Sequence, residues 1–132
     1  MARARQLGMM GMMLAPVAAS SSMALAQIPP KAPEQCFFAR DVNGFSAPND
    51  HTVYIRVGVS KVYRLDLMND CVNLTYRQSI GLESIPAESW ICSPLDATVI
   101  YRDTGFPERC PVTAIHQLSP DELAKLPKRD RP

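Results

Sequence analysis

One stretch of the chain alternates apolar and polar residues strictly enough to predict two paired strands. This stretch runs from His51 to Cys71. Side chains of a β-strand point alternately to its two faces, so the alternation places the apolar residues of each strand on one face. We therefore predict an antiparallel hairpin as the centre of a β domain. Its inward side chains are odd-numbered in both strands: Val53, Ile55, Val57, Tyr63, Leu65 and Leu67.

The same pattern predicts the register of this hairpin. Residues directly opposite in an antiparallel pair point the same way, so odd-numbered inward residues on both strands require an odd number of loop residues. A three-residue loop over Gly58-Val59-Ser60 sets Tyr54 opposite Arg64. The next register would set Arg56 opposite Arg64, and like charges disfavour that pairing. We predict the three-residue loop.

A third run of alternating residues follows the hairpin. Leu74, Tyr76, Ile80 and Leu82 share one face, which predicts a long strand that bends near Gly81. Farther along, the segment Trp90-Ile91-Cys92 is predicted to be a short buried piece. Tryptophan and cysteine are costly to leave exposed in so small a chain.

Two more strands are predicted in the last third of the chain. They span Ala97–Arg102 and Val112–Leu118, and the glycine and the proline of residues 103–109 predict a loop between them. Before the hairpin, Asn43-Gly44 is a turn signal, while residues 37–42 fit either a strand or a short helix.

The end of the chain predicts a short helix. Ser119 suits the N-cap, Pro120 the first helical position and Glu122 the third, which together form a capping box. Pro127 ends the helix at the preceding residue, and residues 128–132 are predicted to be a frayed, charged tail. The resulting fold is mainly β (small α+β). It is an antiparallel sheet or partly open barrel of about five strands with a short C-terminal helix and two disulfides.

The first 26 residues have the pattern of a secretory signal peptide. Arg3 and Arg5 precede an apolar run over 7–19, and Ala24-Leu25-Ala26 is a small-x-small cleavage signal. The apolar run is shorter than the roughly 18 residues that a membrane-spanning helix needs. We expect cleavage after Ala26, a mature chain without a membrane span, and a periplasmic or secreted location.

The remaining chain divides into three parts. Residues 27–35 are a proline-rich linker, 36–127 a single disulfide-bonded β-rich domain, and 128–132 the charged tail. The predicted signal peptide carries 2 of the 14 basic residues and none of the 13 acidic ones, so the mature charge is 12 minus 13, or −1. A nearly neutral chain argues against nucleic acid as a partner.

Four cysteines in an exported chain predict two disulfides rather than a metal site. Zinc sites usually use closely spaced cysteine pairs, and the nearest cysteines here are separated by 17 residues. Three connectivities are possible. We favour Cys71 with Cys92, which ties the end of the hairpin to the tryptophan segment, and Cys36 with Cys110, which ties the first element to the last strand. No metal or other cofactor is expected.

No set of residues predicts catalysis. His51 lies at a strand edge and His116 lies within the last strand, on the same face as Val112, and neither has chemical partners nearby in the sequence. Asp96 precedes a strand and is expected to form a turn rather than to act as an acid or base. Asn73-Leu74-Thr75 matches a glycosylation sequon that we expect to be inert. We assign no catalytic, cofactor-binding or metal-binding residue.

A set of short motifs extends over nearly the whole expected mature chain. The motifs are Cys36-Phe37-Phe38, Val42-Asn43-Gly44-Phe45, Thr52-Val53-Tyr54, Val62-Tyr63-Arg64-Leu65, Cys71, Trp90-Ile91-Cys92 with Asp96 following, Cys110-Pro111-Val112 and Leu118-Ser119-Pro120. This pattern resembles the DUF6491 family of short bacterial exported proteins. That family is uncharacterised, so the resemblance implies an exported protein but no particular activity.

A rigid β frame without a catalytic set suits the presentation of a binding surface. We expect a binding, inhibitory or accessory module that acts on another envelope protein. The alternatives are a structural envelope protein without a discrete ligand and a hydrolytic enzyme with an unrecognised site. Tyrosine and arginine are enriched at protein interfaces, so the predicted partner-binding residues are Tyr54, Arg56 and Arg64 on the outward face of the hairpin.

Overall fold

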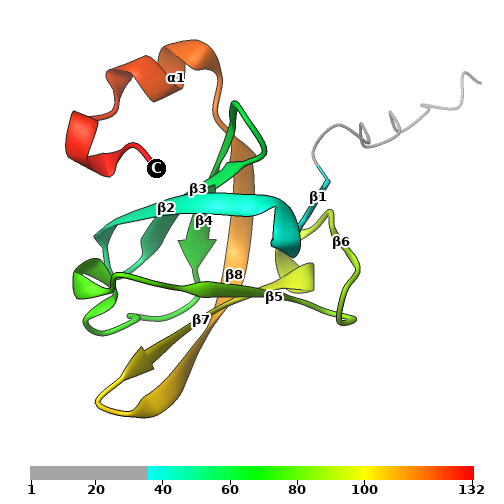
Figure 1. Ribbon diagram of the computed structural model, residues 1–132, viewed down its shortest axis with the longest axis vertical. Coiled ribbons are helices and arrows are strands. Elements are labelled where there is room, and N and C mark those ends of the chain that lie inside the picture. Colours follow the sequence, from blue (N-terminus) through cyan, green and yellow to red (C-terminus); the bar gives the residue numbers. More distant parts are fainter. Residues whose placement is uncertain (1–35) are drawn as a thin grey trace, which may run out of the picture. The chain divides into compact units, whose positions relative to one another are not determined.

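A curved six-stranded antiparallel sheet forms the body of the domain (Figure 1). The computed structural model describes residues 36–132, so the expected signal peptide (1–26) and the proline-rich linker (27–35) lie outside the described residues. The strand order is β2-β3-β4-β8-β7-β5, and the sheet curves into a half-barrel, which confirms the predicted fold class. The strands are β2 (Val42–Asn49), β3 (Thr52–Val57), β4 (Lys61–Leu67), β5 (Gly81–Ser84), β7 (Ala97–Asp103) and β8 (Phe106–Gln117).

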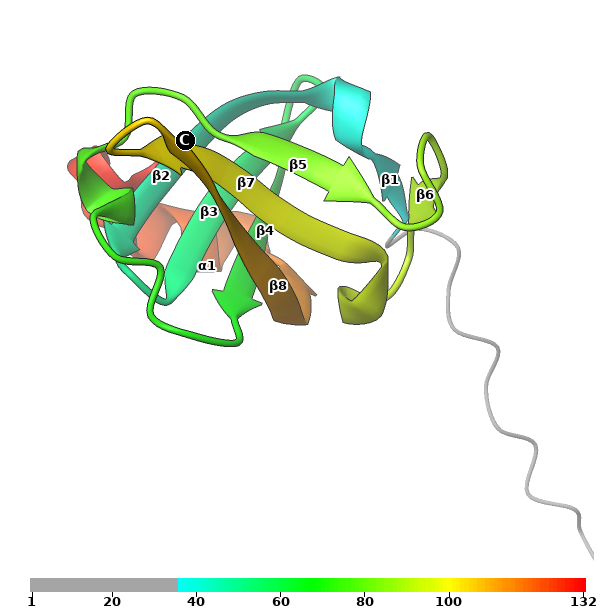
Figure 2. The same ribbon diagram turned by 90° about the horizontal axis from the view of Figure 1, so that it is seen from below.

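A second, two-stranded ribbon lies at one end of the half-barrel. It pairs β1 (Phe37–Phe38) with β6 (Trp90–Ile91) in antiparallel register. Both views place this ribbon beside the end of β5 (Figures 1 and 2). Within residues 36–132 the helices are α1 (Pro120–Lys125) and four short 3₁₀ helices: Ala39–Asp41, Leu74–Tyr76, Pro94–Asp96 and Lys128–Asp130.

The central hairpin has the predicted register and the predicted buried face. Val57 pairs with Lys61 across a three-residue loop, and Tyr54 lies opposite Arg64. All six odd-numbered apolar residues of the two strands are at most 7% exposed. Strict alternation fixes this element because a slip of one residue would move every apolar side chain to the opposite face.

The core lies inside the curve of the sheet and closes against β1 and β6. Phe37 and Ile91 point inward, and the Phe37 ring packs against Tyr63 with 4.7 Å between the ring centroids. The other core residues are Val53, Ile55, Val57, Leu65, Leu67, Cys71, Leu74, Ala97, Val99, Tyr101, Cys110 and Val112.

The predicted long third strand is wrong over its first half. Leu74–Tyr76 forms a 3₁₀ helix, and the strand β5 begins only at Gly81. Contacts with the distant β7–β8 hairpin hold the segment that lies between this 3₁₀ helix and β5. Arg77 donates to the carbonyl of Arg102 and forms an ion pair with Asp103. These nonlocal contacts override the local alternation, which carried no information about them.

The connection between β7 and β8 is much shorter than predicted. Instead of a loop over 103–109, Asp103 pairs with Phe106 across the two residues Thr104 and Gly105. Both turn residues have positive φ, 47° and 91°, as hairpin turns of type I′ require. The tight turn lets β7 continue to Asp103, one residue beyond its predicted end, and lets β8 begin at Phe106, six residues before its predicted start.

A bulge in β8 changes which face carries His116. Val112 pairs with Leu67, but Ala114 pairs with Asp66, so Thr113 is the extra residue. One inserted residue shifts the alternation by one position. Val112 therefore points into the core, whereas His116 points outward, contrary to the prediction that both share a face.

The C-terminal helix has the predicted cap. Ser119 Oγ accepts from the Glu122 amide at 3.2 Å, and a Glu122 carboxylate oxygen accepts from the Ser119 amide at 2.7 Å. The helix ends before Pro127, as predicted. The tail is not frayed, because Arg131 donates to the carbonyls of Ala124 and Leu126. α1 and the tail lie against the outer side of β2, β3 and β4 (Figures 1 and 2).

Both disulfides form, but the favoured pairing is wrong. Cys36 is bonded to Cys92, and Cys71 is bonded to Cys110. The first bond continues the register of the β1–β6 ribbon, since Phe37 lies opposite Ile91 in the same antiparallel pair. The second disulfide joins the segment after the β3–β4 hairpin to β8, which lies between β4 and β7 in the sheet.

Candidate functional site

The predicted partner-binding patch is not a continuous exposed surface. Tyr54 is only 9% exposed, while Arg56 and Arg64 are exposed. The hairpin's outward face is partly covered: Thr52 and Val62 on that face are also buried, and the C-terminal segment lies against it. The predicted exposure of Tyr54 is therefore wrong. A binding role for the two arginines stays a prediction.

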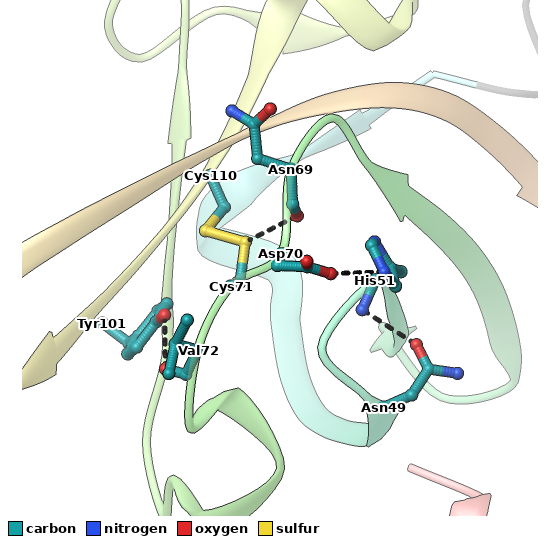
Figure 3. The surroundings of a disulfide bond; sticks show 8 residues. All are labelled: Asn49, His51, Asn69, Asp70, Cys71, Val72, Tyr101 and Cys110. Carbon is teal, nitrogen blue, oxygen red and sulfur yellow. Dashed lines mark hydrogen bonds and ion pairs between the residues drawn. A yellow bond between two sulfur atoms is a disulfide. The ribbon is translucent and has the colours of Figure 1, made fainter.

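The two histidines lie at separate places on the surface, and each contacts a carboxylate. His51 Nε2 lies 2.5 Å from a carboxylate oxygen of Asp70, next to the Cys71–Cys110 disulfide (Figure 3). His116 Nε2 lies 3.2 Å from both carboxylate oxygens of Glu122. Each histidine thus has one acidic neighbour and an exposed position. In the part of the chain that the structure describes, no three His, Cys, Asp or Glu side chains lie close enough together to hold a metal ion.

Asp96 is a turn residue, as the sequence predicts. Its carboxylate accepts hydrogen bonds from the amides of Cys92 and Ser93, at 3.1 and 2.8 Å. The bond from the Ser93 amide is one half of a capping box on the 3₁₀ helix Pro94–Asp96, and the Ser93 side chain, which accepts from the Asp96 amide, is the other half. The carboxylate stabilises the chain just after β6.

The β1–β6 ribbon presents an aromatic pair to solvent. Phe37 and Ile91 point into the core, so their neighbours Phe38 and Trp90 point outward. These two residues lie directly opposite each other, and their ring centroids are 4.0 Å apart. Trp90 is 54% exposed, so the prediction that the whole 90–92 segment is buried holds for Ile91 but not for the tryptophan.

A cation completes this aromatic cluster. The guanidinium carbon of Arg40 lies 4.5 Å from the centroid of the Phe38 ring. An arginine over an aromatic face is held by the negative potential of the ring. Its side chain is 77% exposed, and the nearest carboxylate, that of its neighbour Asp41, is 4.0 Å from Nε. The charged end of Arg40 is therefore available to solvent.

A cavity of about 420 Å³ adjoins the cluster. One wall is the segment Phe38–Arg40, and the opposite wall is the edge strand β5 with the loop that follows it. Ser84 Oγ accepts from the Ser89 amide at 3.2 Å and so folds this loop back beside the strand. We call Phe38, Arg40 and Trp90, together with this cavity, the aromatic site.

Two acidic residues also line the cavity. They belong to β5 and the loop after it, not to the segment that contains Arg40. Glu83 forms a close ion pair with Arg109 of β8. Glu88 lies in the loop at a positive φ of 58° and has an exposed side chain. The lining therefore combines apolar surface, one guanidinium and two carboxylates, of which one is already paired.

Other exposed apolar side chains flank the aromatic site in the sequence. Ile85 is 52% exposed and Leu95 is 80% exposed. The amide of Ile85 donates to the carbonyl of Asp96 at 2.8 Å, which brings the two segments together. Clustered exposed apolar residues are typical of interaction surfaces.

No helix within residues 36–132 is both long and apolar enough to cross a membrane.

A signal for this site is present in the sequence. Two segments have the same order of residue types in opposite directions: a cysteine, an apolar residue and an aromatic residue. They are Cys36-Phe37-Phe38, read forwards, and Trp90-Ile91-Cys92, read backwards. Pairing the two cysteines places phenylalanine opposite isoleucine in the core and phenylalanine opposite tryptophan outside. The favoured pairing of Cys92 with Cys71 concealed this relationship.

The fold and the site define a small, disulfide-bonded, antiparallel β protein with an exposed aromatic cluster. The chain belongs to a family of unknown function (DUF6491), whose model matches residues 1–132. Neither the curated proteins nor the solved structures include a significant match to the chain.

Proposed function

We propose that the domain is a binding module that recognises another protein through the aromatic site. The observation that carries the proposal is the half-exposed Trp90, which packs at a tilt against Phe38, the ring that also carries the guanidinium of Arg40. Tryptophan and arginine are the residue types that contribute most binding energy at protein interfaces. A folded domain of this size gains nothing in stability from leaving its single tryptophan half in water.

The frame around the site favours binding. The Cys36–Cys92 disulfide and the core residues Phe37 and Ile91 fix the ribbon from its inner side. A surface that is already ordered loses little conformational entropy when a partner binds. The proposal therefore makes the domain a binding protein rather than an enzyme, with the partner in the same compartment.

We propose further that this compartment is extracytoplasmic. All four cysteines are paired in disulfides, which persist in oxidising environments. The signal-peptide pattern of the first 26 residues supports the same conclusion. Intact-mass measurement of the protein from envelope extract tests this. We expect a chain that begins at Gln27, and an envelope form that retains Met1 would contradict the proposed route.

Site-directed photo-crosslinking in native envelope extract tests the binding proposal. A photoreactive phenylalanine derivative replaces Trp90 in one variant and Phe106 in a matched control. Phe106 is also aromatic and exposed, at 71%, but it lies at the tip of the β7–β8 hairpin. We expect one stoichiometric protein adduct from position 90 and none from position 106.

The affinity for the captured partner should also depend on the Trp90 side chain. In the purified complex, Trp90→Ala should weaken binding by about 30-fold, the effect of losing a hot-spot residue of about 2 kcal/mol. The exposed position predicts an unchanged melting temperature. No adduct at position 90, or equal adducts at both positions, would contradict the proposal.

A further inference from the structure

We propose that the cavity of the aromatic site binds an apolar side chain of the partner that stands next to a single carboxylate. This inference rests on the proposed function, because it names the chemistry of the partner segment at the same site. The closest minimal ligand is a peptide that ends in leucine with a free α-carboxylate. Volume, apolar lining and charge each support this class of ligand.

The cavity has the size and lining for an apolar side chain. Its volume of about 420 Å³ lies within the roughly 300 to 1,000 Å³ that is usual for ligand sites. Phe38 and Leu82 provide apolar surface on opposite walls, and Ala39 and Ala87 add small side chains. An aliphatic group that enters between these walls removes apolar area from water on both sides.

Arg40 supplies the attraction for a carboxylate. Its guanidinium stays beside the cavity because it rests on the Phe38 ring, 4.5 Å from the centroid. The ion pair with Asp41 is long, 4.0 Å from Nε to Oδ1, and the Arg40 side chain is 77% exposed, so the guanidinium is accessible to a carboxylate of a ligand. A planar guanidinium binds a carboxylate through two parallel hydrogen bonds.

The acidic lining limits the charge of the ligand. Glu83 is neutralised by Arg109, but Glu88 has no cationic partner within the described chain. A ligand with one negative charge gains the contact with Arg40 at moderate cost from Glu88. A dianion such as phosphate or a dicarboxylate brings a second charge toward Glu88 and is disfavoured.

Trp90 provides a direct reporter for this inference. It is the single tryptophan of the sequence, and it packs against the Phe38 ring that lines the cavity. The probe is acetyl-glycyl-leucyl-leucine, and the matched control is the same peptide as its C-terminal amide. Titration of the full mature protein should give a saturable change in tryptophan emission with the acid, and binding about tenfold weaker with the amide.

Two variants assign the effect to the guanidinium. Arg40→Gln should reduce the affinity for the acid about tenfold, to that of the amide. Arg102→Gln, at another exposed arginine, which lies on β7 outside the cavity lining, should change neither affinity. Equal affinity for acid and amide, no saturable change in emission, or tighter binding of inorganic phosphate would overturn the inference.

These outcomes are separable from those of the proposed function. If crosslinking at position 90 captures a partner while the acid and amide bind equally, the binding site stands and its assigned ligand chemistry is wrong. If the peptide acid binds through Arg40 but position 90 captures no protein, the cavity is a peptide-carboxylate site and the protein-binding proposal fails.

Discussion

Arg77 and Asp103 form a partly buried ion pair that joins two distant segments of the chain. The terminal nitrogen Nη2 of Arg77 lies 2.6 Å from Oδ1 of Asp103, and the side chains are 25% and 17% exposed. The other carboxylate oxygen accepts from the side-chain amide of Asn73 at 3.0 Å. One aspartate at the end of β7 therefore holds the irregular segment that the sequence predicts as strand.

Removal of that aspartate should destabilise the fold. Asp103→Ala leaves the guanidinium of Arg77 partly buried without its carboxylate. Breaking a fully buried pair costs about 3 to 5 kcal/mol; with the remaining exposure of this pair, we expect about 2 kcal/mol. Urea unfolding measures the loss in free energy of unfolding. The control is Arg64→Ala, which breaks a more exposed pair with Asp66 and should cost less than about 1 kcal/mol. Equal costs would contradict this interpretation.

The sequence predicts those elements whose determinants are local. The β3–β4 hairpin follows from strict alternation, which specifies both its buried face and its register. The cap of α1 follows from three residues within one turn, Ser119, Pro120 and Glu122. In both elements, the interacting residues are close in the sequence, so the pattern itself contains the information.

Elements that depend on distant partners could not be predicted in this way. The segment around Arg77 takes its shape from Asp103, and the face of His116 depends on an extra residue at Thr113. Trp90 is exposed because its neighbour Ile91 takes the inward position in a two-residue strand. Each of these features requires the pairing of strands to be known first.

The disulfide pairing is directly testable. Alkylation of the native protein without reductant should add no mass, and peptide mapping should join Cys36 to Cys92 and Cys71 to Cys110. Recovery of the Cys71–Cys92 peptide would contradict the structure. The bonds close chain separations of 56 and 39 residues, for which loop-closure entropy predicts about 4 kcal/mol each.

Loss of one disulfide should also affect the aromatic site selectively. The double variant Cys36→Ala/Cys92→Ala releases the end of the β1–β6 ribbon, where Trp90 stacks on Phe38. We expect a shift of tryptophan emission toward that of a fully hydrated indole while the sheet remains folded by circular dichroism. Unchanged emission would show that packing alone holds the ribbon.

Tyr63 carries a hydroxyl for which the fold offers no partner. The side chain is fully buried, and its oxygen has no hydrogen-bond partner among the described residues. Burial raises the pKa of Tyr63, so the group stays neutral. An unpaired buried polar group costs about 1 to 3 kcal/mol. Tyr63→Phe should therefore leave the free energy of unfolding unchanged or raise it by about 1 kcal/mol.

A second tyrosine is the control for that substitution. Tyr101 is also buried, but its hydroxyl donates to the carbonyl of Val72 at 2.9 Å. Tyr101→Phe leaves that carbonyl without its donor and should lower the free energy of unfolding by about 1 kcal/mol. Chemical denaturation of both variants provides the comparison. Destabilisation of similar size in both would mean that the Tyr63 hydroxyl is hydrogen-bonded in solution.

Glu122 should make the stability of α1 depend on pH. The hydrogen bond from the Ser119 amide, followed by that from His116, holds the pKa of this carboxyl below its usual value of 4.5. A depressed pKa means that the charged form stabilises the folded helix. That contribution is fully present above pH 4.5, the value expected in the unfolded chain, and it is lost as pH falls through the lower pKa of the folded state.

Hydrogen exchange of the Leu123 amide measures this local stability, because that amide donates to the Ser119 carbonyl in the first turn. At neutral pH, Glu122→Gln should exchange faster than the unmodified protein, since the uncharged amide is a weaker partner for both donors. The difference should shrink as the pH falls below 4.5. Ser119→Ala removes the other half of the cap and costs about 1 kcal/mol, but it introduces no titrating group. Its effect should persist at low pH, and a Glu122→Gln effect that persists equally would show that the carboxylate charge does not stabilise the helix.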